Sequence, residues 1–296
     1  MTYILIDTSY LIFYRYFALL RWWQFAMPDT ELGNPCENSV FCEKFERAIL
    51  DCVANIKRDL VKIGLLPKVK KAKKANNNDK EGEGKEEDPH VKDISVIACR
   101  DCPRREIWRN ELYGEYKSTR ESDDGFMGGP FFKKVYSEGL MEKAGCDHVL
   151  QYDFLEADDL VAITANYIKT QQPARKIIII ANDADYLQLW SDNCEIVNLK
   201  MNLLNQGKNS YQSPQKNLFM KIVLGDKSDN IHPVFARCGK KMCEELYENP
   251  DLFAQKLHAE EGAYERLLIN KTIIDFAEIP EDLSRPVIER LASIFF

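Results

Sequence analysis

Carboxylate side chains dominate the residues of this chain that could do chemistry. Nine of them fall into five short clusters along the sequence: Asp7; Asp101; Glu156, Asp158 and Asp159; Asp183 and Asp185; Asp226 and Asp229. Several follow an apolar run, where a buried strand would deliver them to one edge of a sheet. Carboxylates collected at one edge repel each other and raise each other's pKa unless divalent cations neutralise them. The pattern therefore predicts a site for hard divalent metal ions.

Two of these clusters also have simpler interpretations. The acids of EADDL (156–160) occupy the expected first turn of a helix, where they could act as plain capping residues beside the helix dipole. In ANDADYLQL (181–189), Asp183 and Asp185 point the same way if the backbone stays extended, ready to hold one ion. A simple turn is the alternative. The recurrence of acids after neighbouring strands favours metal binding in both places.

Alternating apolar runs and helical patterns predict the elements that position these acids. Strands are expected at 3–6, 94–98, 148–152 and 176–181, and helices at 10–25, 40–63, 131–144 and 156–169. Near-continuous apolar strands that alternate with helices predict an α/β fold with a largely parallel sheet covered on both faces. Such sheets bind ligands at the carboxyl ends of their strands, which is where the acids fall.

Two regions differ from this pattern. Residues 68–92 have almost no apolar side chain, begin basic and turn acidic, so we expect a disordered loop there, with a nucleic-acid-binding arm as the alternative. From about Ser213 the pattern is mostly helical, with a break at 225–230. We therefore divide the chain into an α/β domain at 1–212 and a C-terminal helical part at 213–296.

Composition limits the class of protein. The apolar runs are far shorter than the roughly 20 residues of a spanning helix, and the N-terminus lacks the pattern of a secretion signal. Nine cysteines at irregular spacing predict free thiols in a reducing, intracellular compartment. Cys99 and Cys102 form a CxxC pair, but no second pair or well-spaced histidine completes a zinc set.

The net charge of −7 does not exclude a nucleic-acid partner. The nine acids assigned to metal account for more than that excess, and binding would depend on local basic patches.

Four motifs, in order, resemble the flap endonuclease family of structure-specific 5′ nucleases: LIDTSYL, EADDLVA, IIANDADYLQL and LGDKSDNI. Within that family, WRNELYGEYKSTR and NKTIIDFAEIPEDL are most similar to the ribonuclease H of T-even bacteriophages. The resemblance implies a PIN-like catalytic domain, a helical arch at 102–145 and a helix-hairpin-helix-like element in a duplex-binding C-terminal part. It also implies a magnesium-dependent nuclease that removes 5′ flaps or RNA primers in DNA replication, repair or recombination.

The same resemblance implies two magnesium positions, at which we expect manganese to substitute. The first five acids (Asp7, Asp101, Glu156, Asp158 and Asp159) would surround one position, directly or through water. The last four (Asp183, Asp185, Asp226 and Asp229) would build the other. Two hard cations beside a phosphodiester can activate water and stabilise the charge of the transition state.

The segment WRNELYGEYKSTR matches the family's entrance to the arch. Lys117 and Arg120, three apart, would share a helix face and hold the scissile phosphate. Tyr116 would stack on an unpaired base. Arg109 and Tyr113 are assigned to DNA contact. A solvated basic face with surface tyrosines is the alternative interpretation.

The chain departs from the family after LGDKSDNI, where the family pattern is a glycine-rich hairpin, roughly GVxGIGxKTA. At the positions where the family pattern has glycine, this chain has Pro233, Ala236 and Cys238. A tight nest of backbone amides, and a potassium ion bound there, are therefore in doubt. We expect Arg237, Lys240 and Lys241 to hold duplex phosphates by side-chain charge instead.

Two other functions share part of this pattern. A PIN-type ribonuclease has the same sheet and acidic site but usually lacks the long C-terminal helical part and the GDKSDN loop. A catalytically silent binder of branched DNA would be expected to lose metal carboxylates, and all nine are present. The expected partners are DNA with 5′ flaps, nicks or single-strand/duplex junctions, with RNA–DNA hybrids as a further candidate. We expect a monomer without membrane contact.

Overall fold

The computed structural model describes residues 1–68, 94–119, 125–208, 210–211 and 213–295. The loop predicted at 68–92 therefore lies, apart from Lys68, outside the described residues.

Five parallel strands form the central sheet, in the order β3-β2-β1-β4-β5. Their bounds are Thr2–Asp7 (β1), Ile94–Cys99 (β2), His148–Leu150 (β3), Lys176–Ile180 (β4) and Cys194–Val197 (β5). Every strand pairing is parallel. The sequence predicted the first four strands and the parallel sheet. It missed β5, because four residues that include Glu195 give too short an apolar run.

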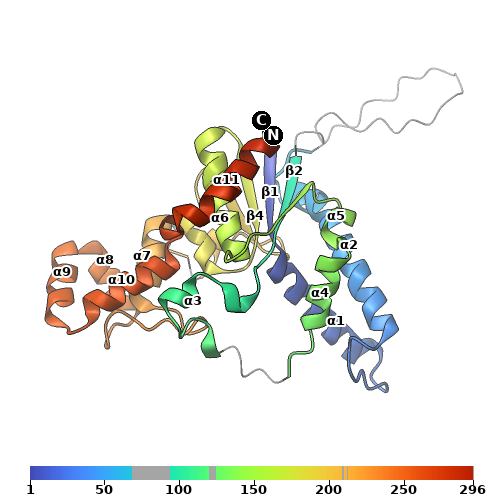
Figure 1. The fold of residues 1–296 in the computed structure, drawn as a ribbon, viewed down its shortest axis with the longest axis horizontal. Coiled ribbons are helices and arrows are strands. Elements are labelled where there is room, and N and C mark those ends of the chain that lie inside the picture. The colour runs from blue at the N-terminus through green and yellow to red at the C-terminus, as the bar shows by residue number, and fades with distance from the viewer. Residues whose placement is uncertain (69–93, 120–124, 209, 212, 296) are drawn as a thin grey trace, which may run out of the picture.

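Helices cover both faces of this sheet, because successive side chains of a strand point to opposite sides. Ile4 and Ile6 pack in one buried cluster with α1 (Thr8–Ala26), α2 (Ser39–Lys62), α4 (Gly129–Ser137) and α5 (Leu140–Lys143). Tyr3 and Leu5 pack on the other face with α6 (Ala157–Gln171) and α11 (Glu281–Phe295). Figure 1 shows the two helical layers on either side of the strands.

A group of helices extends from one side of this core (Figure 1). It contains α7 (Pro214–Leu224), α8 (Lys240–Glu248), α9 (Pro250–Ala259) and α10 (Ala263–Ile274) around a small apolar cluster of its own. It joins the core through α3 (Arg109–Leu112) and the 3₁₀ helix η4 (Ala184–Leu189). The last helix, α11, returns to pack on α6. The division at residue 212 stays a prediction.

Short 3₁₀ helices complete the connections: η2 (Arg104–Glu106), η5 (Leu204–Gln206) and η6 (Phe276–Glu278). None of the helices in the described part of the chain is long and apolar enough to cross a membrane.

Three local predictions were wrong. The helix expected at 131–144 is two helices, because Gly139 adopts a left-handed backbone (φ 61°) that ends α4. Asp183 keeps an extended backbone as the N-cap of η4, but Asp185 lies inside that 3₁₀ helix, so the extended run expected across both residues is broken. Residues 114–117 form turns, and Lys117 itself has a φ of 55°. Lys117 therefore lies on no helix face, and Arg120 lies outside the described residues.

Candidate metal centre

The predicted carboxylates meet at the carboxyl edge of the sheet, in a cavity of about 1120 Å³. Seven of the nine line this cavity: Asp7, Asp101, Glu156, Asp158, Asp183, Asp185 and Asp229. The remaining two, Asp159 and Asp226, each belong to a group of three neighbouring carboxylates. We call these groups the two acidic groups: Glu156, Asp158 and Asp159 form the first, and Asp185, Asp226 and Asp229 form the second. The structure thus brings together residues from five separate segments, and their binding of metal stays a prediction.

Asp7 is the last residue of the central strand β1, and Asp101 follows the end of the neighbouring strand β2 by two residues. Asp7 caps α1 by accepting the amide of Tyr10 at 2.9 Å, and the Tyr186 hydroxyl donates to its other oxygen at 2.9 Å. Asp101 accepts the amide of Ala157 at 2.6 Å and the hydroxyl of Ser9. Burial and the charge of Asp101 raise the pKa of Asp7 to about 7. Burial raises the pKa of Asp101 as well, assisted by Glu156.

The three acids of EADDL have different surroundings. Glu156 and Asp159 form a capping box at the start of α6. Burial together with the neighbouring charges of Glu156 and Asp159 raises the pKa of Asp158 well above its usual range. Burial acts on Glu156 in the same direction, but Lys117 and Arg109 outweigh it and lower the pKa of Glu156. The acids of this motif therefore both cap α6 and place several carboxylates close together.

Arg109 is buried, with 2% of its surface exposed, so its assignment to the DNA surface was wrong. Its guanidinium binds both oxygens of Asp159, at 2.8 and 2.7 Å, and reaches Glu156 at 3.3 Å. Its Nε donates to the carbonyl of Ile273 at 2.8 Å. Asp159 also accepts the Trp108 indole at 3.0 Å, so both its oxygens are engaged. Arg109 therefore ties the acids of α6 to the end of α10.

The two tyrosines of the predicted gateway point inward. Tyr116 is buried and donates its hydroxyl to Glu156 at 2.9 Å, so its ring is not open to stack on a base. Tyr113 is half-buried and donates to the carbonyl of Asn230 at 3.0 Å. Both residues join the segment before the arch to the acidic site, and the stacking assigned to Tyr116 is corrected.

Lys117 enters the cavity from a strained position. Its ammonium lies 2.5 Å from Glu156 and 3.9 Å from Asp229, and its amide donates to the carbonyl of Asp229 at 2.9 Å. A left-handed backbone costs a non-glycine residue roughly 1–2 kcal/mol. The bond to Asp229 holds that conformation. Lys117 thus places one cation between the two acidic groups.

The second group is built by η4 and the loop after α7. Asp183 accepts the amide of Asp185 at 3.0 Å, and Asp226 accepts the amide and hydroxyl of Ser228, both at 2.7 Å. Lys221 of α7 lies 2.7 Å from Asp185 and also pairs with Asp226. Burial and Asp183 raise the pKa of Asp185 to about 7. Sequence reasoning missed Lys221, although it stands on the predicted helix five residues before Asp226.

The donor set fits hard divalent cations. One oxygen each of Glu156, Asp158 and Asp159 lies within 4.8 Å of the others, and the same holds for Asp185, Asp226 and Asp229. Carboxylate oxygens without thiolate or imidazole suit magnesium, calcium or manganese. Burial and the charges of neighbouring acids raise the pKa values of Asp7, Asp158 and Asp185, so added positive charge would favour their ionised forms. Bound cations would supply it.

An aromatic wall faces the acids across the same cavity. We define it as Phe13, Phe17, Phe126, Phe132 and Tyr136, all of which line the cavity. Phe13 and Phe17 are 40% and 48% exposed, and the Phe13 ring lies 4.8 Å from Phe132 and 5.2 Å from Phe126. Sequence reasoning missed this wall, although aromatic residues at helical spacing on α1 could have indicated it.

The three basic residues assigned to duplex DNA (Arg237, Lys240 and Lys241) are exposed near the start of α8. No residue from 231 to 241 has a positive φ. The amide of Ala236 donates to Glu260 at 2.7 Å, and Arg266 holds Glu260 at 3.0 Å. The backbone therefore lacks the left-handed turns of an amide nest.

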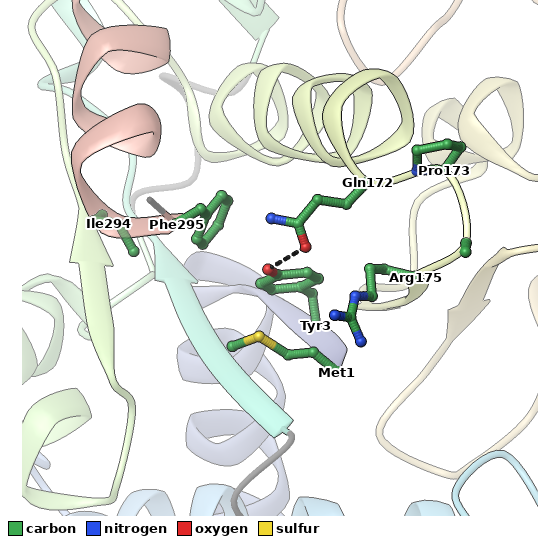
Figure 2. A pocket seen from close by; sticks show the side chains of 8 residues that line it. Met1, Tyr3, Gln172, Pro173, Arg175, Ile294 and Phe295 are labelled. Atoms are coloured by element: carbon green, nitrogen blue, oxygen red, sulfur yellow. Dashed lines mark hydrogen bonds between the residues drawn. The ribbon is translucent and has the colours of Figure 1, made fainter.

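A second pocket, of about 470 Å³, lies beside the chain ends, far along the sheet from the acids. Figure 2 shows Tyr3 donating to Gln172, at 2.9 Å, between Met1 and Phe295. The described residues that line this pocket include no acidic side chain. All nine cysteines are free thiols, and Cys99 and Cys102 are buried.

Comparison with known sequences finds similarity to proteins named as nucleases. Residues 86–218 match the family model of the 5′-3′ exonuclease N-terminal resolvase-like domain. The 5′-3′ exonuclease of Buchnera aphidicola subsp. Schizaphis graminum is 30% identical over 138 residues, 42% of each chain. The ribonuclease H of Enterobacteria phage T4 is 26% identical over 221 residues, 65% of this chain and 68% of that protein. The chain matches less than half the length of its Buchnera relative.

Solved structures share the fold over their whole length. The T5 D15 protein, co-crystallised with metal ions, has a TM-score of 0.60 at 15% identity and is covered completely, as is this chain. A complex of the bacteriophage T5 D15 flap endonuclease with DNA and metal ions has a TM-score of 0.59 at 15% identity and covers 99% of both chains.

Proposed function

We propose that this chain belongs to the flap endonuclease and 5′-3′ exonuclease family of 5′ nucleases and that it is a metal-dependent nuclease, as its similarity to such proteins supports. Its substrates are DNAs with 5′ flaps, nicks or single-strand/duplex junctions, and its metal is magnesium, with manganese as a substitute. Removal of RNA primers is part of the proposal, because one relative is named ribonuclease H.

The observation that carries this proposal is the convergence of carboxylates at the carboxyl edge of the sheet. Seven acids from five segments line one open cavity, and six of the nine acids form two groups of three with metal-ligand spacing. A silent DNA binder has no need to collect acids whose pKa values are raised by burial and by one another's charge. Catalysis with divalent cations explains why the fold tolerates this repulsion.

The side chains divide the work by position. When bound, two divalent cations would neutralise charge on the phosphodiester and assist the attacking water. Glu156 and Asp158 would hold the first position, and Asp185, Asp226 and Asp229 the second. Asp7 and Asp101 lie in the same cavity and would act directly or through water. Lys117, between the two groups, would hold the scissile phosphate once Glu156 turns to the metal.

The walls of the cavity suit a nucleic-acid strand. Exposed rings of the aromatic wall would stack unpaired bases, the role that sequence reasoning gave to Tyr116. The duplex would lie on the exposed Arg237, Lys240 and Lys241. A helix-hairpin-helix-like element at this place, the catalytic domain at 1–212, the monomeric state and the intracellular compartment remain proposals.

Cleavage of end-labelled 5′-flap, nicked and RNA-primed duplexes, with Mg²⁺ or with EDTA, tests the function. We expect cleavage with Mg²⁺ or Mn²⁺ and none with EDTA. Asp183→Ala with Asp185→Ala should abolish cleavage while flap binding stays measurable, because fewer anions hold metal and fewer repel DNA. Near-normal turnover by this double variant would reject the two-metal assignment. Cleavage confined to single-stranded RNA would favour a PIN-type ribonuclease.

A further inference from the structure

Arg100 is a cation of the cavity wall that neither acidic group uses. It directly follows β2 and precedes Asp101, and its amide donates to the carbonyl of Leu150 at 2.9 Å. Its side chain lines the acidic cavity. The guanidinium carbon lies over the Tyr136 ring, 3.7 Å from its centre, in a cation–π contact.

The guanidinium has no anionic partner among the residues that the structure describes. Its Nε is buried without a hydrogen bond to any described residue, and its side chain forms no ion pair with one. A buried donor without a partner has lost its hydration without compensation, which costs stability. An anion that enters the cavity would remove this cost.

Arg100 lies between the aromatic wall and the carboxylates of the cavity. Tyr136 belongs to the aromatic wall, with its ring 6.2 Å from Phe132. The Tyr136 hydroxyl lies 3.4 Å from the hydroxyl of Ser9, which donates to Asp101. Arg100 therefore lies where the stacking surface meets the carboxylates, beside the reaction centre and outside both acidic groups.

We propose that Arg100 binds a phosphate group of the substrate strand inside this cavity. The inference rests on the proposed nuclease function and adds a binding subsite to it. A guanidinium presents several donors in one plane and binds phosphate oxygens in pairs, which an ammonium cannot do. The cation–π contact with Tyr136 positions the guanidinium before the strand arrives. The phosphate is either an internal phosphodiester or the terminal 5′-monophosphate, because both offer the same oxygens.

Binding measurements in EDTA separate this role from catalysis. Arg100→Gln should weaken the binding of single-stranded and flap DNA about tenfold, the effect expected for one charge-assisted phosphate contact. The slope of log affinity against log salt should fall by about 0.7 for the single strand. Arg100→Lys should keep that slope and bind with intermediate affinity. Affinity and salt slope in EDTA are the readouts, because no cleavage occurs without metal and binding is then measured by itself.

Arg15 offers a matched control. Its Nε is also buried without a hydrogen-bond partner in the described part of the chain, and its guanidinium lies over the Tyr14 ring at 5.5 Å, but it does not line the cavity. Arg15→Gln should leave DNA affinity and the salt slope unchanged. If the Arg15 and Arg100 variants lose DNA affinity equally, Arg100 acts only on the structure, and the proposal is overturned. If Arg100→Gln does not fold, Arg100→Lys decides, because an unchanged affinity there contradicts paired phosphate contact.

Substrate ends distinguish the two phosphate sources. Weaker binding seen only with 5′-phosphorylated strands assigns the terminal monophosphate, and an equal effect with 5′-hydroxyl strands assigns an internal phosphodiester. Wild-type affinity and slope in Arg100→Gln would refute the subsite. If the wild-type chain neither binds nor cleaves these DNAs, the proposed function fails instead, so the two failures are separable.

Discussion

Lys221 occupies the place between two carboxylates where a metal ion would be expected. Its ammonium pairs with Asp185 at 2.7 Å and with Asp226. Burial acts to lower the pKa of Lys221, but the neighbouring acids outweigh burial and raise that pKa, so the lysine stays charged. A lysine so placed holds the second acidic group together without metal. It also competes with metal for the same oxygens.

Lys221→Met should therefore lower stability in EDTA by about 1–3 kcal/mol, because two acids lose their counter-ion. Added Mg²⁺ should then raise the melting temperature more than it does in the wild type. Lys216→Met is the control, since Lys216 pairs with the exposed Glu248 at 2.6 Å. Thermal unfolding with and without Mg²⁺ measures both effects. A metal-dependent gain no larger than that of the wild type would contradict competition at this site.

Arg109 acts through Glu156 and Asp159 rather than on substrate, so it is a positioning residue. Arg109→Met should destabilise the fold by about 3–5 kcal/mol, because a buried carboxylate loses its partner. It should also weaken Mg²⁺ binding, measured by calorimetry. Arg109→Lys should restore part of the stability but less of the metal affinity, because an ammonium cannot hold Asp159 in the same paired geometry.

Arg266 provides the comparison for Arg109. It also binds a carboxylate, Glu260, and a backbone carbonyl, that of Val234 at 2.7 Å, but outside the acidic cavity. Arg266→Met should cost stability and leave metal affinity unchanged. If both methionine variants bind Mg²⁺ like the wild type, Arg109 only stabilises the fold.

At the scale of elements, the segment before α8 holds duplex DNA differently from a glycine-rich hairpin. Its backbone has no left-handed residue from 231 to 241, and Glu260 takes the amide of Ala236. Phosphate binding then depends on mobile side-chain charges, which release counterions when the duplex binds.

Lys240→Ala with Lys241→Ala should reduce the salt slope of duplex binding by about 0.9 for each phosphate that a lysine no longer neutralises. Wild-type binding should show no preference for potassium over sodium at constant ionic strength. Titrations of labelled duplex at several salt concentrations measure both. A potassium-specific gain in affinity would restore an ion-bridged hairpin despite the missing glycines.

Across the whole molecule, the acidic centre couples stability to pH and metal. The pKa of Asp7 and that of Asp185 are raised to about 7 in the fold, from an ordinary value of 3.8. Between about pH 4 and pH 7 the folded chain binds more protons than the unfolded chain, so its stability falls as the pH rises. Glu156 and Asp226, whose pKa values are lowered, add stability that is lost only at more acidic pH.

We therefore expect the melting temperature in EDTA to fall from about pH 5 to about pH 8. Mg²⁺ should reverse that fall, because bound cations remove the repulsion between ionised acids. The stabilisation by metal should thus be larger at the alkaline end of this range than at the acidic end. A metal effect that does not depend on pH would place the ions away from Asp7 and Asp185.

Local sequence patterns were sufficient to predict most of the secondary-structure elements and the convergence of the acids. Four of the five strands, the parallel sheet and the start of α6 at Glu156 follow from apolar periodicity and capping, which act over a few residues. Acids after parallel strands must meet at one edge, so their convergence also follows from the sequence. The motifs that resemble flap endonucleases indicated the family on the same local basis.

Tertiary packing decided which charges face the cavity. Arg109 and Tyr116 stand in a segment whose polar composition predicts exposure, yet Asp159, Glu156 and the carbonyl of Ile273 bury them. Those partners lie about 40 to 160 residues away in the sequence, so no local pattern reveals them. Lys221 and Arg100 also acquire their roles only when α7 and β2 deliver them to the acids. Burial and pairing are properties of the assembled core, and composition alone does not determine them.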